Sequence, residues 1–313
     1  MCESSSVRGQ APNRAFCLSM KSSTLQIGSF TLDWGSRTYV MGILNVTPDS
    51  FSGDGIIAKG EVVKSAVEQA REFILYGADI LDVGGESTRP GSEPVNAEEE
   101  MQRVIPVIEE LRKNFPQVLI SIDTYKAKVA DAAIQAGANI INDVWGFRAD
   151  SELASVAAKH KVPVILMHNR SNPVSVEVRE KLGGTYIGAE YDDLLEDVKR
   201  ELMDSVKIAL KAGVEAKLIM LDPGIGFGKK REHNLELINR LGEVRSLGYP
   251  ILLGTSRKSF IGFTLDLPPD QRVEGTAATV AVGITRGADI IRVHDVKEMV
   301  RVAKMTDAIV RGQ

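Results

Sequence analysis

Short apolar runs recur along the chain and are separated by amphipathic segments. Each run is rich in β-branched residues and is continuously apolar rather than alternating, which is typical of strands buried on both faces in a parallel sheet. Eight such runs are predicted to be strands: Tyr39–Val46, Asp79–Gly84, Leu119–Asp123, Asn139–Val144, Pro163–His168, Leu218–Asp222, Pro250–Thr255 and Asp289–His294.

The segments between the runs have the spacing of amphipathic helices. In Val296–Val310 the helical period is followed by apolar residues, namely Val296, Met299, Val300, Ala303 and Ile309. Four charged residues fall outside that stripe: Lys297, Glu298, Arg301 and Lys304. Glu190–Ala212 is the longest helical segment. The phrases YGAD, QAGAN and TRGAD come just before strands. Their glycines indicate helix C-caps, because glycine readily adopts the left-handed conformation required there.

Eight successive strand-then-helix units predict an α/β protein, a single (β/α)8 TIM barrel. An open doubly wound sheet is the alternative, and the count of eight favours the barrel. Leu25 to Tyr39 is predicted to form a short N-terminal hairpin, LQIGSF followed by TLDW, with turns at Gly28 and at Gly35-Ser36. Residues 24–313 are therefore expected to be one domain, and residues 1–23 a disordered tail.

Composition narrows the possible partners. The chain has 313 residues, of which 43% are hydrophobic and 26% charged, and its net charge is −4. This charge provides no global attraction for nucleic acid or an anionic membrane. No apolar run is long enough for a membrane helix. Cys2 and Cys17 both precede the predicted core, so the barrel has no disulfide and no thiolate metal site, which fits a reducing, cytoplasmic location.

Polar residues follow the predicted strands at the end where barrel enzymes have their active sites. Because buried charge is costly unless paired, a ring of such groups indicates a ligand or an internal network. The residues, in strand order, are Asn45; Glu86, Thr88 and Arg89; Asp123; Asn142; His168; Asp222; Ser256 and Lys258; Arg292 and His294.

Each of these residues also has a structural interpretation. Asp123 could be the N-cap of the following helix, at even odds with a ligand-binding role. Asn142 could bind backbone groups at its strand end, and His168 and His294 could be packed histidines. Four residues outside the candidate set are expected to be caps, loop contacts or structural histidines: Asp143, Asp150, His160 and His233.

The residue types indicate the chemistry of the ligand. Acceptors at Asp123, Asn142 and Asp222 suit a nitrogen-rich ring with several N–H donors, because a carboxylate accepts two parallel bonds from an amidine-like edge. The cations suit an anion such as pyrophosphate, and comprise Arg89, Lys258, Arg292 and His294. Together they indicate a pterin or purine pyrophosphate.

Residues 222–229, DPGIGFGK, are rich in glycine but lack the spacing of a nucleotide-binding P-loop. We interpret these glycines as room for a flat ring near the backbone. No His/Cys cluster has metal-ligand spacing, whereas aspartate and asparagine beside pyrophosphate suit Mg²⁺.

These motifs resemble the successive signatures of the dihydropteroate synthase family, in the order found in that family. The resemblance extends from about Gly42 to Val296. The motifs are GILNVTPDSFSGDG (42–55), DVGGESTRPG (82–91), SIDTYK (121–126), INDVWG (141–146), LMH (166–168), DPGIGFGK (222–229), GTSRKSFIG (254–262) and RVHDV (292–296).

The resemblance implies three subsites. It implies that the pterin ring is held deep in the barrel by Asp123, Asn142, Asp222 and Lys258. It implies that the pyrophosphate is held by Asn45, Arg89, Arg292 and His294, with Asn45 helping to place a Mg²⁺ cofactor. It implies that 4-aminobenzoate is bound by Phe51, Thr88, Pro90, Phe227, Ser256 and the stem of Lys258.

The implied reaction is an SN1-like displacement in folate biosynthesis. Pyrophosphate leaves the dihydropterin substrate, and the amine of 4-aminobenzoate attacks the resulting cation to give 7,8-dihydropteroate. Catalysis then depends on electrostatic stabilisation and positioning. The implied catalytic residues are Asp123, Lys258, Arg292 and His294. The resemblance also implies a homodimer and a target of sulfonamides.

Three other functions are weighed against this one. A methyltetrahydrofolate–corrinoid methyltransferase would bind a pterin but would not need the pyrophosphate cations. A catalytically dead scaffold would be expected to have lost a site residue, and none is lost. A Schiff-base aldolase using Lys258 lacks a general base. The sequence departs from the family in the order FSGDG instead of FSDGG, in the stretch after His168, and in the N-terminal tail.

Overall fold

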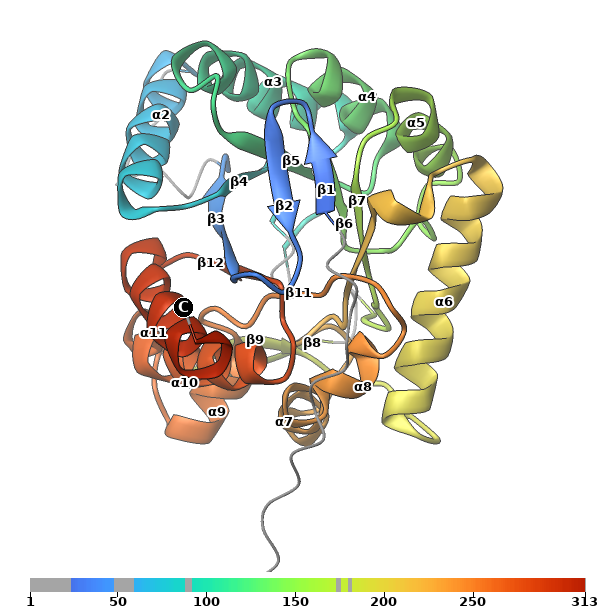
Figure 1. Cartoon of the computed structure of the whole chain (residues 1–313), viewed down its shortest axis with the longest axis vertical. Coiled ribbons are helices and arrows are strands. Elements are labelled where there is room, and N and C mark those ends of the chain that lie inside the picture. Colours follow the sequence, from blue (N-terminus) through green and yellow to red (C-terminus); the bar gives the residue numbers. More distant parts are fainter. Residues whose placement is uncertain (1–23, 48–58, 88–91, 173–175, 180–181, 313) are drawn as a thin grey trace, which may run out of the picture.

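Eight parallel strands form a closed barrel at the centre of the molecule (Figure 1). The computed structural model describes residues 24–47, 59–87, 92–172, 176–179 and 182–312. The barrel strands are β3 (Tyr39–Asn45), β4 (Ile80–Gly84), β5 (Leu119–Asp123), β6 (Ile140–Asp143), β7 (Val164–Met167), β10 (Ile219–Asp222), β11 (Leu252–Leu253) and β12 (Ile290–Val293). The closed barrel was predicted from the count of eight.

The strands are neighbours in the order of the sequence, and a bridge between Leu221 and Ile251 joins β10 to β11 and closes the ring. Almost every strand residue is buried, as expected when the barrel interior and the helices cover both faces. The predicted strand ranges are therefore confirmed, except that Pro250–Thr255 contains only two residues of regular strand.

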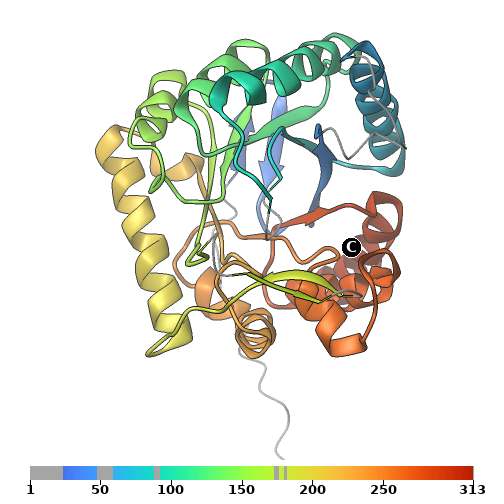
Figure 2. The same ribbon diagram turned by 180° about the vertical axis from the view of Figure 1, so that it is seen from behind.

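Helices surround the barrel, and each main helix lies beside the strands that it connects (Figures 1 and 2). They are α2 (Lys59–Tyr76), α3 (Ala97–Asn114), α4 (Ala127–Gln135), α5 (Leu153–His160), α6 (Leu194–Ala212), α7 (Arg231–Asn239), α8 (Leu241–Arg245), α9 (Ser259–Leu265), α10 (Val273–Thr285) and α11 (Val296–Arg311), with 3-10 turns at Ala216–Leu218 and Pro269–Gln271. The predicted start of the longest helix at Glu190 is wrong, because Asp193 accepts hydrogen bonds from Leu195 N and Glu196 N and caps α6 there.

An antiparallel hairpin, β1 (Thr24–Ile27) and β2 (Phe30–Asp33), precedes the barrel and lies across one of its ends (Figure 1). Leu25, Leu32 and Trp34 pack into the core. The hairpin was predicted, with its turn at Gly28, where φ is +58°. Its division into strands was wrong at Phe30, which pairs with Ile27 and so begins the second strand.

A second hairpin, β8 (Val176–Arg179) and β9 (Gly183–Tyr186), comes from the long segment after β7. It lies at the other end of the barrel, in front in Figure 2. The sequence did not predict it, because its short strands contain two glycines and two charged residues instead of an apolar run.

Asp150 accepts backbone amides at the start of α4 and just before α5. Helix α4 begins at Ala127 without a side-chain cap from its own N-cap residue, Lys126. Asp150 Oδ2, from the next loop, instead accepts the Ala127 amide at 2.8 Å, and Oδ1 accepts the Glu152 amide at 2.9 Å. The sequence interpretation of Asp150 as a cap or loop contact is confirmed.

We expect Asp150→Ala to lower the free energy of unfolding by roughly 1 kcal/mol, the usual effect of removing a helix cap. Urea denaturation followed by circular dichroism would measure it. Because Asp150 takes no part in the site described below, turnover at a temperature well below the unfolding transition should be unchanged. A loss of turnover in the folded variant would contradict the structural role.

Candidate active site

Strand register brings the predicted site residues into one row at the carboxyl end of the barrel. Asn45 pairs with Gly84, Gly84 with Asp123, and Asp123 with Asn142. On the other side, His168 N donates to Asp222 O, which aligns the ends of β7 and β10. Side chains from four different strands therefore open into the same end of the barrel, as in other (β/α)8 enzymes.

Arg292 of β12 lies at the centre of a charge network inside this row. Its Nε donates to Asp82 Oδ2 at 2.6 Å and its Nη2 to Asp123 Oδ2 at 2.5 Å. Asn142 Nδ2 also donates to Asp82 Oδ2, at 3.1 Å. Asp123 thus faces Arg292 and does not cap α4, so its interpretation as a helix N-cap is wrong.

Asp82 is a site residue that the sequence analysis missed. It is fully buried on β4, and its Oδ1 has no partner among the described residues. An unpaired buried acceptor of this kind can receive an N–H from a ligand. The signal in the sequence was a single carboxylate inside an otherwise apolar strand, ILDVG.

Burial sets the protonation of these groups. It raises the pKa of Asp123 to about 7, against the opposing effect of Arg292. Burial opposes the charge of Arg292 too, but Asp82 and Asp123 hold its pKa above the ordinary value. A carboxyl that titrates near neutral pH can either accept or donate a proton to a bound ring.

Asp222 and Lys258 form the other half of the row. Asp222 Oδ1 accepts the Gly224 amide at 2.7 Å, and burial raises the pKa of the Asp222 carboxyl despite the nearby Lys258. Burial lowers the pKa of Lys258 to about 8. The Lys258 ammonium donates to Ile225 O and lies 4.7 Å from the centre of the Phe227 ring. An aromatic ring, a carboxylate and a cation therefore surround one space.

Ser256 and His294 are in contact at the mouth of the barrel. Ser256 Oγ accepts the His294 amide and lies 3.1 Å from His294 Nδ1. Between Ser256 and Lys258, Arg257 has a φ of +58° and pairs with Asp295. A non-glycine residue in this conformation is strained, and such strain is commonly found at functional sites.

Arg272 connects the loops at this end of the barrel, and the sequence analysis did not identify it. Its guanidinium is almost fully buried and donates to three backbone carbonyls from different loops. The acceptors are Leu267 O at 3.0 Å, Arg257 O at 2.8 Å and Leu182 O at 2.9 Å. Arg272 therefore connects the loop of Lys258 to the β8–β9 hairpin.

Several predictions fall outside this constellation. Phe51, Thr88, Arg89 and Pro90 lie outside the described residues, so their predicted roles are not placed here. Asp143 binds the backbone amides of Trp145 and Phe147, as expected of a loop contact.

The other histidines have structural partners. His160 pairs with Asp131, and His233 Nδ1 accepts the Lys230 amide at 3.3 Å, both in helices as predicted. His168 is buried behind the row, next to Lys229 and Glu201.

Over the part of the chain that the structure describes, no cluster of three His, Cys, Asp or Glu side chains has the geometry of a metal site. Asn45, the predicted Mg²⁺ ligand, is half-buried, and its Oδ1 would lie 3.9 Å from a Cβ added at Gly84, beside Asp123. These oxygens suit a hard cation that also binds ligand phosphates.

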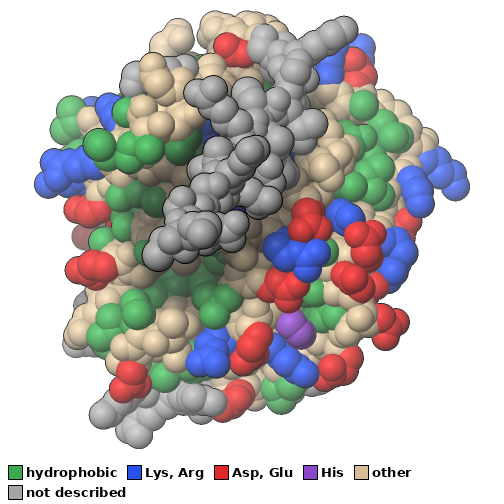
Figure 3. Space-filling model, turned by 60° about the horizontal axis from the view of Figure 1, so that its bottom comes forward, with side chains coloured by type: hydrophobic (Ala, Val, Ile, Leu, Met, Phe, Trp, Pro, Cys, Tyr) green, Lys and Arg blue, Asp and Glu red, His purple; other side chains and the backbone are tan. Residues whose placement is uncertain are grey.

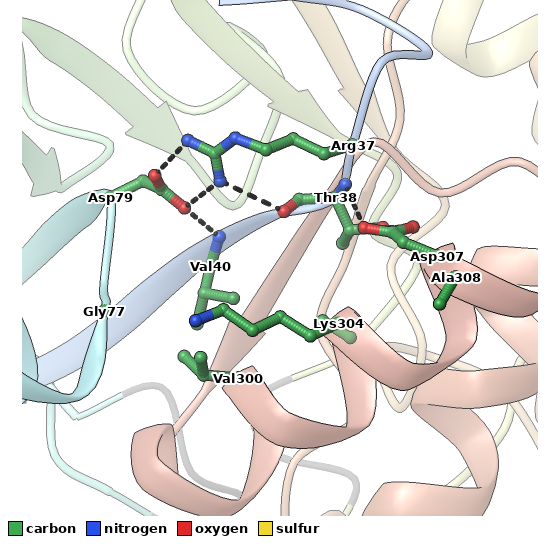
Figure 4. Close-up of a pocket in the computed structure, with 10 residues that line it drawn as sticks. Arg37, Thr38, Val40, Gly77, Asp79, Val300, Lys304, Asp307 and Ala308 are labelled. Atoms are coloured by element: carbon green, nitrogen blue, oxygen red, sulfur yellow. Dashed lines mark hydrogen bonds and ion pairs between the residues drawn. The ribbon is translucent and has the colours of Figure 1, made fainter. Parts of the chain in front are cut away.

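A separate cavity of about 240 Å³ lies at the opposite, amino end of the strands (Figure 4). Arg37 pairs with Asp79, and Asp79 also accepts the Val40 amide. Asp307 accepts both the amide and the hydroxyl of Thr38. Because these charges bind one another and the backbone, we assign this cavity to stability and not to catalysis.

On the face in Figure 3, acidic and basic side chains are interspersed, and no patch of one sign dominates the described residues there. No helix in the described ranges combines the length and apolarity of a membrane span.

A family model described as a pterin-binding enzyme matches residues 41–294, which defines the class of protein to which this fold and site correspond. The chain is 54% identical over 288 residues to a dihydropteroate synthase of Clostridium beijerinckii, covering 92% of this chain and 100% of that relative. The chain belongs to the dihydropteroate synthases of the pterin-binding family.

Solved structures agree with this assignment. A Clostridium difficile dihydropteroate synthase in the presence of pteroic acid has a TM-score of 0.80 and 48% identity, and the match covers 89% of this chain and 99% of that one. A Xanthomonas albilineans dihydropteroate synthase with 4-aminobenzoic acid has a TM-score of 0.82 and 39% identity, covering 92% and 98%. The predicted family is confirmed.

Proposed function

We propose that this chain is a transferase that joins 6-hydroxymethyl-7,8-dihydropterin pyrophosphate to 4-aminobenzoate, giving 7,8-dihydropteroate and pyrophosphate. The observation that carries the proposal is a row of acceptors, Asp123, Asn142 and Asp222, of which the last two are buried. This row opens beside the cations Lys258 and Arg292. The acceptors suit the N–H edge of a pterin, and the cations suit its pyrophosphate.

The geometry suits displacement through a cation. As pyrophosphate leaves, positive charge develops on the methylene carbon and spreads into the ring, and the carboxylates of Asp222 and Asp123 stabilise it. Lys258 and Arg292 offset the growing negative charge on the leaving group. Arg292 Nη1 has no acceptor in the described part of the chain and is open to an anion. The amine of aminobenzoate then attacks and loses a proton.

We assign the aminobenzoate subsite to the space beside Phe227, Ser256 and the stem of Lys258. Phe227 offers a ring face, Lys258 offers a nearby charge, and Ser256 contacts His294 at the mouth. By the resemblance, Phe51, Thr88, Arg89 and Pro90 complete this subsite and the pyrophosphate subsite.

Mg²⁺ is the proposed cofactor, with Asn45 as its protein ligand. Such an ion would neutralise the leaving pyrophosphate, and it usually retains several waters and binds mainly through substrate phosphates. Asn45 would supply the hard oxygen for this role, and Arg292 and His294 would share the anion.

The geometry argues against a corrinoid methyltransferase, the other pterin-binding barrel weighed from the sequence. It requires no anion site, whereas here Arg292, Lys258 and His294 come together at the mouth. We therefore retain the synthase as the function best supported by the geometry.

A pyrophosphate-release assay tests the proposal. Pyrophosphate should be released from the dihydropterin pyrophosphate by the enzyme with Mg²⁺, and 4-aminobenzoate should raise the rate and appear in the product by mass spectrometry. Absence of aminobenzoate-dependent product from folded protein would reject the function.

The order of substrate binding provides a further prediction. The pyrophosphate, with Mg²⁺, is expected to pair with the cations Arg89, Arg292 and His294 beside the aminobenzoate subsite. The dihydropterin pyrophosphate should therefore bind first and complete the subsite to which aminobenzoate then binds. Sulfonamides, which mimic aminobenzoate, should follow the same order. Calorimetric titration of aminobenzoate or a sulfonamide, with and without pyrophosphate, Mg²⁺ and a pterin, measures the difference. Equal affinity in both conditions would reject the ordered mechanism but not the function.

We further propose that the enzyme works in the cytoplasm as a homodimer. The dimer follows the family, and light scattering at micromolar concentration tests it. Small-molecule substrates are its proposed partners, with neither nucleic acid nor membrane among them.

A further inference from the structure

Side chains bind several backbone groups of the loop after β10. Gly224 N donates to Asp222 Oδ1, and Gly226 N donates to Asn234 Oδ1 at 2.7 Å. Lys258 reaches Ile225 O from the side of the active site. This loop connects Asp222 to Phe227, so its shape sets the distance between the pterin carboxylate and the aromatic ring.

Lys229 holds the same loop from behind. Its side chain is almost completely buried, with 2% of the residue exposed. Its Nζ lies 2.8 Å from Gly224 O, 3.1 Å from Phe227 O and 2.8 Å from His168 Nδ1. One amine therefore faces three acceptors, two at the ends of the loop and one on the end of β7.

Glu201 determines which ring nitrogen of His168 carries the proton, and so which group donates the hydrogen bond between His168 and Lys229. His168 Nε2 lies 3.1 Å from Glu201 Oε2, although the N–H is not aimed well enough to be an ordinary hydrogen bond. The carboxylate favours a proton on Nε2, which leaves Nδ1 as an acceptor. Burial lowers the pKa of His168 to about 3, so the ring is neutral. Lys229 must then donate all three bonds, as only an ammonium can.

Burial lowers the pKa of the Lys229 ammonium well below its ordinary value, and the carboxylates of Asp222 and Glu201 oppose that change. Methionine would fill similar space without this cost, because burying a charge is expensive. Because Lys229 is buried at this cost and bonds to both Gly224 O and Phe227 O, we look for its function in the active site.

We propose that Lys229 is a positioning residue for the pterin subsite, which fixes the loop between Asp222 and Phe227 and places a positive charge behind the Asp222 carboxylate. This proposal rests on the proposed function. Lys229 is not placed in contact with substrate, so it acts through the loop and through Asp222.

The charged groups around Asp222 give the proposal a pH signature. Asp222 faces Lys258 from the β11–α9 loop, Arg292 from β12 and Lys229 from its own loop, and each cation lowers its pKa. Removing the Lys229 charge should raise the Asp222 pKa. Tight pterin binding requires the ionised Asp222 carboxylate. On acidification, a variant without the Lys229 charge should therefore lose pterin binding at a higher pH than the unmodified enzyme does.

The experiment compares Lys229→Met with Lys230→Met. Lys230 is a neighbouring lysine that is half-exposed and pairs with Glu190 on the surface. Calorimetry with a non-reactive pterin should give an affinity about 10- to 100-fold weaker for Lys229→Met, the usual effect of losing hydrogen bonds from a charged group. The Lys230→Met control should stay within about twofold. With saturating pterin, the KM for aminobenzoate should change less than the KM for the pterin substrate.

Two outcomes would overturn the proposal: a folded Lys229→Met protein with unchanged pterin affinity, or weakened affinity with an unshifted acid limb, which would indicate packing alone. If Lys229→Met does not fold, Glu201→Gln becomes the test variant. It removes a carboxylate that favours the ammonium form of Lys229, and it leaves no cavity in the core. It should shift the acid limb in the same direction, and no shift would overturn the proposal. Failure of the unmodified enzyme to release pyrophosphate would instead reject the function.

Discussion

The Asp222→Asn protein is expected to fold normally and to lose tight pterin binding. Asparagine keeps the Oδ1 that accepts the Gly224 amide, so the start of the loop should be preserved. It cannot accept two parallel N–H bonds, because one of its two terminal atoms is a donor. The loss of one desolvated, charge-assisted bidentate contact is roughly 2–4 kcal/mol, or about 30- to 1,000-fold in affinity.

Calorimetry with a non-reactive pterin measures this loss, and circular dichroism checks the fold. Asp289→Asn is the matched control, since Asp289 is equally buried but binds Ile251 N and Arg245 at the opposite end of the barrel. The control should lose stability and keep pterin affinity. Unchanged affinity in folded Asp222→Asn would exclude Asp222 from the pterin subsite.

Arg292→Met is expected to lower the free energy of unfolding by about 3–5 kcal/mol, because it leaves Asp82 and Asp123 buried without their counter-ion. Both carboxylates accept from this one guanidinium, and Asp82 is fully buried. Urea denaturation at neutral pH measures the change. Lys128→Met, which removes an exposed pair with Glu98, is the control and should cost at most about 1 kcal/mol.

The deficit should also depend on pH. Asp123 already has a pKa raised to about 7 in the folded protein, and Arg292 opposes that rise. Without Arg292 the folded pKa rises further above the unfolded value of about 3.9. Above about pH 7 the folded variant still binds this proton whereas the unmodified protein has released it, so the deficit should increase as the pH rises above about 7 and should level off below it. A deficit that does not increase as the pH rises above about 7 would argue against an uncompensated carboxylate.

The barrel could be predicted from the sequence, and so could most of the polar residues at the carboxyl ends of its strands. Continuous apolar runs located the strands because both faces of each strand are buried, and the polar residues that follow them had to meet at one end. The β8–β9 hairpin was not predicted, since its strands are only four residues long and pair with each other outside the barrel sheet. The start of α6 was misplaced because Asp193 ends the preceding loop.

Asp82, Lys229 and Arg272 were missed for a shared reason. Each is a charged residue whose burial depends on partners distant in sequence: Arg292 is 210 residues from Asp82, and His168 is 61 residues from Lys229. Arg272 binds Leu182 O, 90 residues away. Local patterns assign such residues to the surface. A lone charge inside a strand, as in ILDVG, was the only available signal.

The way the barrel closes has a consequence for its local stability. The seam between β10 and β11 is one bridge, Leu221 to Ile251, and β11 itself has two residues. Amide protons along this seam should therefore exchange with solvent sooner than those of the longer β3–β4 ladder. Asp222 ends one side of the seam and Lys258 follows the other. A pterin that binds both groups would connect the two edges, so occupancy of the site should slow exchange at the seam more than elsewhere in the barrel.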